Sequence, residues 1–312
     1  MITRITNAAI SAAAQRNLQT AMQRLATAQT KASSLEAISK PSDNPAGTAT
    51  SMAIRAETRA NAQFSRNVGD AQGWLATADT ALASATTILN RVRDLTVRGA
   101  NDGSINASGK EAIAIELETL RDSLMDAANA KYAGRTVFAG TSDAGTAVTA
   151  EPVLDADGKP VAGETKVVFN PPAGGTVERR TGANTTIRVD TDATAVFGPA
   201  TEGGDDVFSL ISNIIKDLRA GTNISTRIGD VDSAMQQVRD AQTSVGVRHA
   251  TVLAADASLK DEAVALEGRR SAVEDVDLGT AILDLKTQEV AYQAALAASA
   301  KVLQPTLMDF LR

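Results

Sequence analysis

Few residues in this chain have the types and spacing that catalysis requires. The one histidine, His249, is the side chain best suited to act as a base near neutral pH, and cysteine is absent. His249 falls between Val245 and Val252 on a helical seam, where a histidine is more often an interhelix hydrogen-bonding residue than a base. Without cysteine, a thiolate nucleophile, a thiolate metal ligand and a disulfide are all excluded. We therefore predict no catalytic residue, no metal site, no cofactor and no enzyme activity.

Three glycine-containing stretches come close to functional motifs without matching them. Residues 103–110 have the wrong spacing for a phosphate-binding loop, and Glu111 follows where Ser or Thr is required. Residues 140–145 place their second glycine one position too late for a nucleophile elbow. Residues 155–158 open like a calcium loop but lack its later ligands, so an Asp-Gly hairpin turn explains them better.

Composition favours helices that pack through thin apolar seams. Aromatic residues make up 3% of the chain, so its 43% of hydrophobic residues must be mainly Ala, Val, Leu and Ile. A net charge of -6 argues against nucleic acid as a partner. No run of about 18 apolar residues could span a membrane, and the N-terminus lacks the features of a cleaved secretory signal.

The last part of the chain has the clearest helical pattern. Residues 278–311 are rich in alanine and nearly free of glycine, and Pro305 should end the ordinary helix near Gln304. Beyond it lies an apolar tail with Leu307, Phe310 and Leu311. Apolar residues along the helix recur at three- and four-residue steps that are interrupted at Glu289 and Ser299: Ile282, Leu285, Tyr292, Leu296 and Leu303.

A second seam begins near the N-terminus and predicts a helix that pairs with another. Its positions alternate four- and three-residue steps: Ala14, Leu18, Ala21, Leu25, Ala28, Ala32 and Leu35. Residues 1–40 carry a net charge of +4 and residues 274–312 a net charge of -3. We therefore expect the two ends of the chain to pair with each other.

The N-terminal helix should stop at a proline-bounded elbow. Pro41 and Pro45 disfavour helical conformation in the residues before them, and Ser42, Asp43 and Asn44 are turn and cap formers. Since helical patterns lie on both sides, we interpret the elbow as a candidate joint between domains.

The middle of the chain predicts a helical bundle interrupted by a β-rich insertion. Heptad positions run from Ile54 to Val92, return over residues 113–127 and again from Val231 to Leu266. Residues 141–204 hold five of the eight prolines, with short β-branched runs at 166–169 and 186–190. The fold class is therefore mainly α, a long helical bundle or coiled coil formed by the N- and C-terminal segments, with a small β-rich domain inserted in the middle.

This pattern predicts three domains. Residues 1–45 and 272–312 would form a terminal helical domain, residues 46–140 and 205–271 a long helical bundle, and residues 141–204 an inserted β-rich lobe that projects outward.

Several short motifs resemble the bacterial flagellin superfamily, and within it the hook-filament junction proteins, also called hook-associated protein 3. They are ITRIT at residues 2–6, the heptad of 25–38 that leads into KPSDNP at 40–45, YQAAL at 292–296, QP at 304–305 and DFL at 309–311. The resemblance covers roughly the first 140 and last 100 residues.

The resemblance implies a structural subunit of the bacterial flagellum that joins hook to filament by self-assembly of its terminal helices. Expected partners are neighbouring copies, the hook-side junction protein, flagellin and an export chaperone on the C-terminal region, with no nucleic acid and no membrane. The expected location is extracellular, reached by type III export without a cleaved signal peptide. The predicted assembly interface consists of Leu18, Leu25, Leu35, Ile282, Leu285, Tyr292, Leu296, Leu303, Leu307, Phe310 and Leu311.

Three alternatives remain open from the sequence. The chain could be a flagellin that forms the filament itself, which belongs to the same structural class. It could be a helical hydrolase whose β lobe is catalytic, in which case Ser142 or His249 would be essential. It could also use the lobe for surface adhesion in addition to assembly.

Overall fold

The computed structural model describes residues 2–101, 105–142, 145–154, 160–170, 176–200 and 203–303. Contacts between residues divide the chain into two compact units. We call Met1–Ala60 with Glu262–Arg312 the terminal unit, and Asn61–Asp261 the central unit. Each unit is described by itself below.

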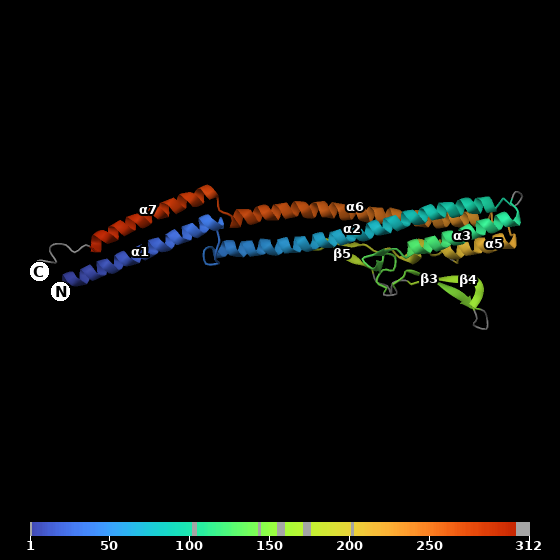
Figure 1. Cartoon of the computed structure of the whole chain (residues 1–312), viewed down its shortest axis with the longest axis horizontal. Coiled ribbons are helices and arrows are strands. Elements are labelled where there is room, and N and C mark those ends of the chain that lie inside the picture. The colour runs from blue at the N-terminus through green and yellow to red at the C-terminus, as the bar shows by residue number, and fades with distance from the viewer. Residues whose placement is uncertain are drawn as a thin grey trace. The chain divides into compact units, whose positions relative to one another are not determined.

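The terminal unit is built around two helices from opposite ends of the chain. Helices α1 (Ile2–Ser34) and α7 (Leu278–Leu303) lie side by side, and their Cα atoms approach to 8 Å or less (Figure 1). Alanines in both seams permit this close approach, because a methyl side chain keeps the backbones near each other. The start of α2 (Pro45–Gly99) and the end of α6 (Arg227–Glu274) complete the unit. The pairing of the two chain ends is confirmed.

In the central unit, α2 and α6 run antiparallel. Contacts that advance along α2 retreat along α6: Asn61 Nδ2 donates to the Leu259 carbonyl at 3.2 Å, Gln242 Nε2 to Asp79 Oδ1 at 3.3 Å, and Arg93 Nε to Asp232 Oδ1 at 2.5 Å. The heptads explain this pairing. All six heptad positions of α6 are buried: Val231, Val238, Val245, Val252, Leu259 and Leu266.

Two shorter helices cover the α2–α6 pair. Helix α3 (Ala107–Ala128) packs against α5 (Val207–Ala220). Asn106 caps α3 by accepting from the Gly109 amide, and Asp206 caps α5 by accepting from the amides of the second and third residues after it. Gly221 ends α5 in the left-handed conformation, with φ of 74°.

Three separate antiparallel hairpins follow α3, the first of them just before the inserted region and the other two within it. They are β1 (Lys131–Tyr132) with β2 (Arg135–Thr136), β3 (Val148–Leu154) with β4 (Pro160–Phe169), and β5 (Glu178–Arg180) with β6 (Thr186–Arg188). A short helix, α4 (Ala193–Phe197), follows β6. The Asp-Gly turn expected between β3 and β4 lies outside the described residues.

The inserted region shares its core with the helices, which corrects the expectation of a projecting lobe. Its buried side chains belong to the same hydrophobic cluster as those of α2, α3, α5 and α6: Ala147, Val148, Val167, Val177, Ile187, Val189, Ala193, Val196 and Phe197. Phe197 contacts both Phe138 and Phe208, with ring centroids 5.7 and 5.9 Å apart. The short strands bury too little to form a core alone, so they pack on the bundle.

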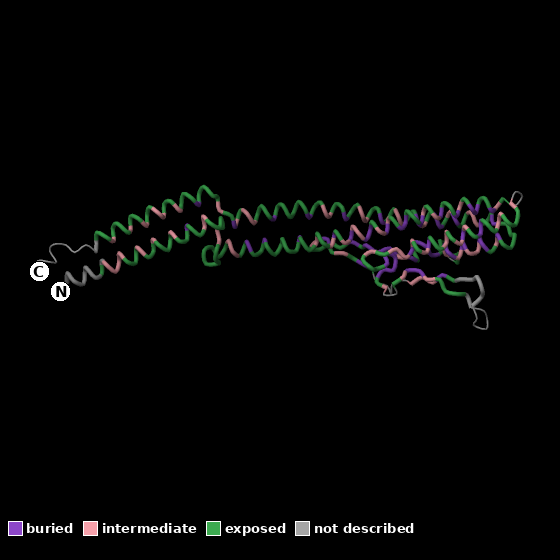
Figure 2. Tube along the Cα trace, in the orientation of Figure 1, coloured by how far each residue is buried: buried purple, intermediate pink, exposed green. Residues whose placement is uncertain are grey.

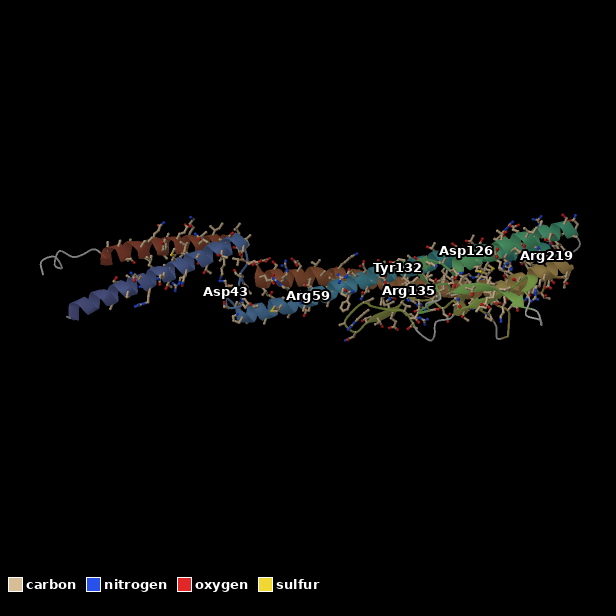
Figure 3. The ribbon with its side chains drawn as sticks, turned by 60° about the horizontal axis from the view of Figure 1, so that its bottom comes forward. Asp43, Arg59, Asp126, Tyr132, Arg135 and Arg219 are labelled. Atoms are coloured by element: carbon tan, nitrogen blue, oxygen red, sulfur yellow. The ribbon has the colours of Figure 1, made fainter. Side chains whose placement is uncertain are left out.

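The single tryptophan marks where the first hairpin meets α2. Tyr132 packs edge-on against Trp74 with ring centroids 6.2 Å apart, and the Arg135 guanidinium lies 5.7 Å from the same ring. Tyr132 and Arg135 are labelled in Figure 3. Arg179 approaches the ring at 5.9 Å. Trp74 is 2% exposed, so its fluorescence reports on the folding of the central unit.

Candidate assembly interface

The seam between α1 and α7 is built mainly from small residues. On α1, Ala28 is buried, and Ala14, Leu18, Ala21, Leu25 and Ala32 are half-buried, as the heptad predicts. On α7, Ala281 is buried, and Leu285, Gln288, Tyr292, Ala295 and Ser299 are half-buried. Each of these side chains buries little apolar area. Apolar burial between α1 and α7 therefore stabilises this helix pair only weakly in the isolated chain.

The seam of α7 differs in part from the predicted one. Leu285 and Tyr292 lie in it as expected, but Ile282 and Leu296 are 47% and 43% exposed. Ala281 and Ala295, one residue earlier in each case, face α1 instead, since close helix packing favours the smaller side chain.

The apolar residues left out of the seam form an exposed face on α7. Leu283 is 71% exposed and Val290 is 65% exposed. We define the α7 face as Leu278, Ile282, Leu283, Val290 and Leu296. Figure 2 shows that α1 and α7 are largely exposed or half-buried, whereas buried positions are frequent in the central unit. A run of large apolar side chains along one exposed helix is a typical protein interaction surface.

The rest of the predicted interface is only partly described. Leu307, Phe310 and Leu311 lie outside the described residues, as does the side chain of Leu303. Leu35 is 41% exposed and has a positive φ of 58°. It follows the last residue of α1, and its amide donates to the Lys31 carbonyl at 2.9 Å, a helix ending that usually takes glycine.

The opposite charges of the two chain ends are not joined as ion pairs. No residue of α1 is acidic, and Arg16, Arg24 and Lys31 make no ion pair among the described side chains. In the described part of α7, Glu289 pairs with Lys286 of the same helix at 2.8 Å. Long-range attraction can still favour the pairing, but it contributes little in salt.

Helix α1 ends at Ser34, earlier than the predicted elbow, and the elbow residues 41–44 lie in the connection that leads into α2. Asp43, labelled in Figure 3, accepts from the Lys40 amide at 3.0 Å. Asn44 caps α2 by accepting from the Gly47 amide at 2.9 Å, and Pro45 takes the first helical position. Pro41 and Ser42 lie exposed in the connection. Both sides of the elbow belong to the terminal unit, so its role as a joint between domains stays a prediction.

One buried carboxylate ties this elbow to the end of α6. Glu274 accepts hydrogen bonds from Ser51 Oγ, from Arg55 Nε at 2.8 Å and from Arg270 Nη1 at 3.4 Å. The Glu274 carbonyl also accepts from the Ala37 amide at 2.6 Å. The hydrogen bonds from Arg55 and then Ser51 lower the pKa of Glu274 to about 2.

Sequence reasoning missed the Glu274 cluster. Its members lie more than 200 residues apart in the chain, because Ser51 and Arg55 follow the elbow and Glu274 ends α6. The available signal was local: Ser51 and Arg55 are four residues apart, as are Arg270 and Glu274, so each pair shares a helix face.

Candidate metal ligands and acid-base residues are few among the described residues. No group of three or more His, Asp or Glu side chains is placed to bind a metal within the described ranges. His249 is half-buried on α6. None of the helices, as far as they are described, is long and apolar enough to cross a membrane.

Comparison with known proteins places both ends of the chain in one family. Residues 5–143 match the model of the bacterial flagellin N-terminal helical region, and residues 228–311 match that of the bacterial flagellin C-terminal helical region. Flagellin A of Vibrio anguillarum is 33% identical over 129 residues, which are 41% of this chain and 34% of that protein. The match therefore spans about a third of that relative's length.

Two solved structures share the fold over most of the chain. Xanthomonas campestris FlgL has a TM-score of 0.59 at 19% identity, and the match covers 70% of this chain and 99% of that one. The flagellar junction protein FlgL from Legionella pneumophila has a TM-score of 0.57 at 13% identity, with 72% and 100% covered. The predicted fold class, a mainly helical chain with a small β-rich middle region, is confirmed.

Proposed function

Because this chain belongs to the bacterial flagellin superfamily, we propose that it is a structural subunit of the flagellum that joins hook to filament. The proposal rests on the structure of the terminal unit. Its two helices pair through a thin alanine seam and leave the apolar α7 face uncovered. A weak intramolecular pair with an exposed apolar face is suited to gain its stability on assembly.

The α7 face supplies the driving force for assembly in this proposal. Burying a side chain such as Leu283 contributes roughly 1.5–3 kcal/mol, and several such contacts per subunit add along a ring. Leu18, Leu25, Leu285 and Tyr292 would hold the intramolecular seam, while Ile282 and Leu296 would contact the neighbouring copy. Leu307, Phe310 and Leu311 stay a predicted part of the same interface.

The remaining assignments are proposals of the same kind. FlgL from Legionella pneumophila is described as a flagellar junction protein, and we extend that role to this chain because the two proteins share a fold. We include as partners neighbouring copies, a hook-side junction protein, flagellin and an export chaperone, and we place the protein outside the cell in the flagellum. The division of the helices into a terminal domain and a long bundle domain also belongs to the proposal.

Filament flagellin is the second candidate. Its specific support is that Flagellin A of Vibrio anguillarum, a curated relative at 33% identity, is a flagellin. Since the family is structural, the hydrolase alternative has no comparable support.

Growth on hook ends separates the two candidates. Purified full-length chain is added to isolated hooks that carry the hook-side junction protein, and the ends are imaged by electron microscopy. We expect a short collar that stops growing at any chain concentration and then accepts flagellin. Long filaments made of this chain alone would instead identify it as a filament flagellin.

A further inference from the structure

A cavity of about 640 Å³ in the central unit lies outside the proposed assembly interface. One wall is α6, and the other is the segment that runs from β6 through α4. Its polar lining includes Arg188, Thr191, Asp192, Gln237, Asp240 and Arg248. The volume lies within the range of small-molecule sites.

Two hydrogen bonds hold the walls of this cavity together. Gln237 Nε2 on α6 donates to the Ala195 carbonyl of α4 at 2.9 Å. Arg248 Nη1, also on α6, donates to the Asp190 carbonyl at 2.7 Å. Both bonds fix long polar side chains that would otherwise be free to move. The cavity is therefore formed before any ligand arrives.

One of the two arginines in the cavity lacks a carboxylate partner. Asp190 is fully buried and accepts from Arg188 Nε at 3.1 Å and Arg188 Nη2 at 2.9 Å, and its Oδ1 also accepts from the Val177 amide. Asp190 is thus occupied by Arg188. Arg248 is half-buried and forms no ion pair with any described residue. Burial, and next the nearby charge of Arg188, lower the pKa of Arg248.

Two buried polar atoms in the lining also lack partners. Thr191 is 8% exposed, and its Oγ1 has no hydrogen-bond partner among the described residues. The same holds for Gln237 Oε1, which is fixed as an acceptor because its Nε2 is already donating. Buried polar atoms are nearly always paired in folded proteins. Arg248 donates to the Asp190 carbonyl and, at 3.1 Å, to Ser244 Oγ, but it has no carboxylate partner among the described residues. An unpaired hydroxyl and an unpaired amide oxygen beside this arginine indicate that a ligand completes the site.

We propose that this cavity binds a small monocarboxylate that also carries hydroxyl groups, the chemistry of an acidic sugar. Its carboxylate would lie on the Arg248 guanidinium, whose planar fork matches a carboxylate. One of its hydroxyls would pair with Thr191 Oγ1, and others would donate to Gln237 Oε1 and to Asp192 or Asp240 at the rim. The same two aspartates disfavour a dianion such as phosphate. This proposal does not depend on the assembly role, and it would still hold if the chain did not join hook to filament.

Calorimetric titration of the full-length chain with glucuronate tests the proposal, with glucose, acetate and inorganic phosphate as comparison probes. We expect glucuronate to bind and the three comparison probes to bind at least tenfold more weakly. Glucose lacks the carboxylate, acetate lacks the hydroxyl groups, and phosphate is a dianion instead of a monoanion. No binding of glucuronate, or equal binding of any comparison probe, would overturn the proposal.

Two variants separate binding from folding. Thr191→Val keeps the side-chain shape and removes an unpaired hydroxyl, so it should leave the melting temperature unchanged or raise it, while weakening glucuronate about two- to tenfold. Arg248→Met should weaken glucuronate by about tenfold or more. Arg66→Gln, an exposed arginine on α2 outside the cavity, is the matched control and should bind normally. Unchanged binding in both cavity variants would contradict the assignment.

Discussion

The double substitution Leu283→Glu and Val290→Glu is expected to stop the chain from adding to hook ends while leaving the isolated chain folded. Both side chains are more than 60% exposed on α7, so their replacement by a good helix former should change the stability of the isolated chain by at most about 0.5 kcal/mol. In an assembled ring the same positions would bury two unpaired carboxylates. We expect the affinity for hook ends to fall by about 100-fold or more, measured by electron microscopy and sedimentation.

A matched control tests whether the effect belongs to the α7 face. Val264 lies on α6 in the same unit and is 74% exposed, so Val264→Glu makes one such apolar-to-glutamate change at a similarly exposed position away from the α7 face. It should add to hook ends nearly as the parent chain does. If the control variant fails equally, or if the double variant adds normally, the α7 face is not the interface.

Glu274→Gln is expected to destabilise the terminal unit by about 2 kcal/mol, because charge-assisted hydrogen bonds from Ser51, Arg55 and Arg270 are lost or weakened together. Glu274 is 7% exposed, so water does not readily replace these partners. The measurement is thermal unfolding followed by helical circular dichroism. Trp74 fluorescence, which reports on the central unit, should change little.

The same variant should remove a dependence on pH. The folded-state pKa of Glu274 is about 2, below the ordinary 4.5, so its stabilising contribution is complete above about pH 4.5 and is lost as pH falls toward 2. The parent chain should therefore lose terminal-unit stability over this window, and Glu274→Gln should lose less. Glu267→Gln serves as the control, since Glu267 also pairs with Arg270 but is exposed. Equal pH profiles for parent and Glu274→Gln would contradict the role of the cluster.

Much of the fold could be predicted because heptads specify which residues face a neighbour. The buried positions of α6 from Val231 to Leu266 follow from spacing alone. The α7 seam was harder. Large residues such as Ile282 suggested a buried stripe, whereas close packing against α1 selected Ala281 and its equivalents, and left the larger side chains exposed.

The features that sequence reasoning missed depend on contacts between distant residues. Glu274 meets Ser51 across 223 positions, and Arg248 meets the Asp190 carbonyl across 58. No local sequence pattern predicts contacts between residues so far apart in the chain. Likewise, short strands with β-branched residues predicted hairpins, but only the shared core around Phe197 shows that they pack on the helices.

Hydrogen exchange of α1 and α7 in the dilute chain and in hook-bound collars tests most directly whether the terminal unit functions by assembly. Since Ala28 and Ala281 are the only buried apolar residues among the described side chains of this helix pair, we expect rapid exchange over residues 11–34 and 278–301 of the dilute chain, compared with α2 and α6 of the central unit. Collars should slow that exchange by about 100-fold or more. Equally slow exchange in the dilute chain, at concentrations where it is monomeric, would show that the pair is already stable and would contradict the proposal.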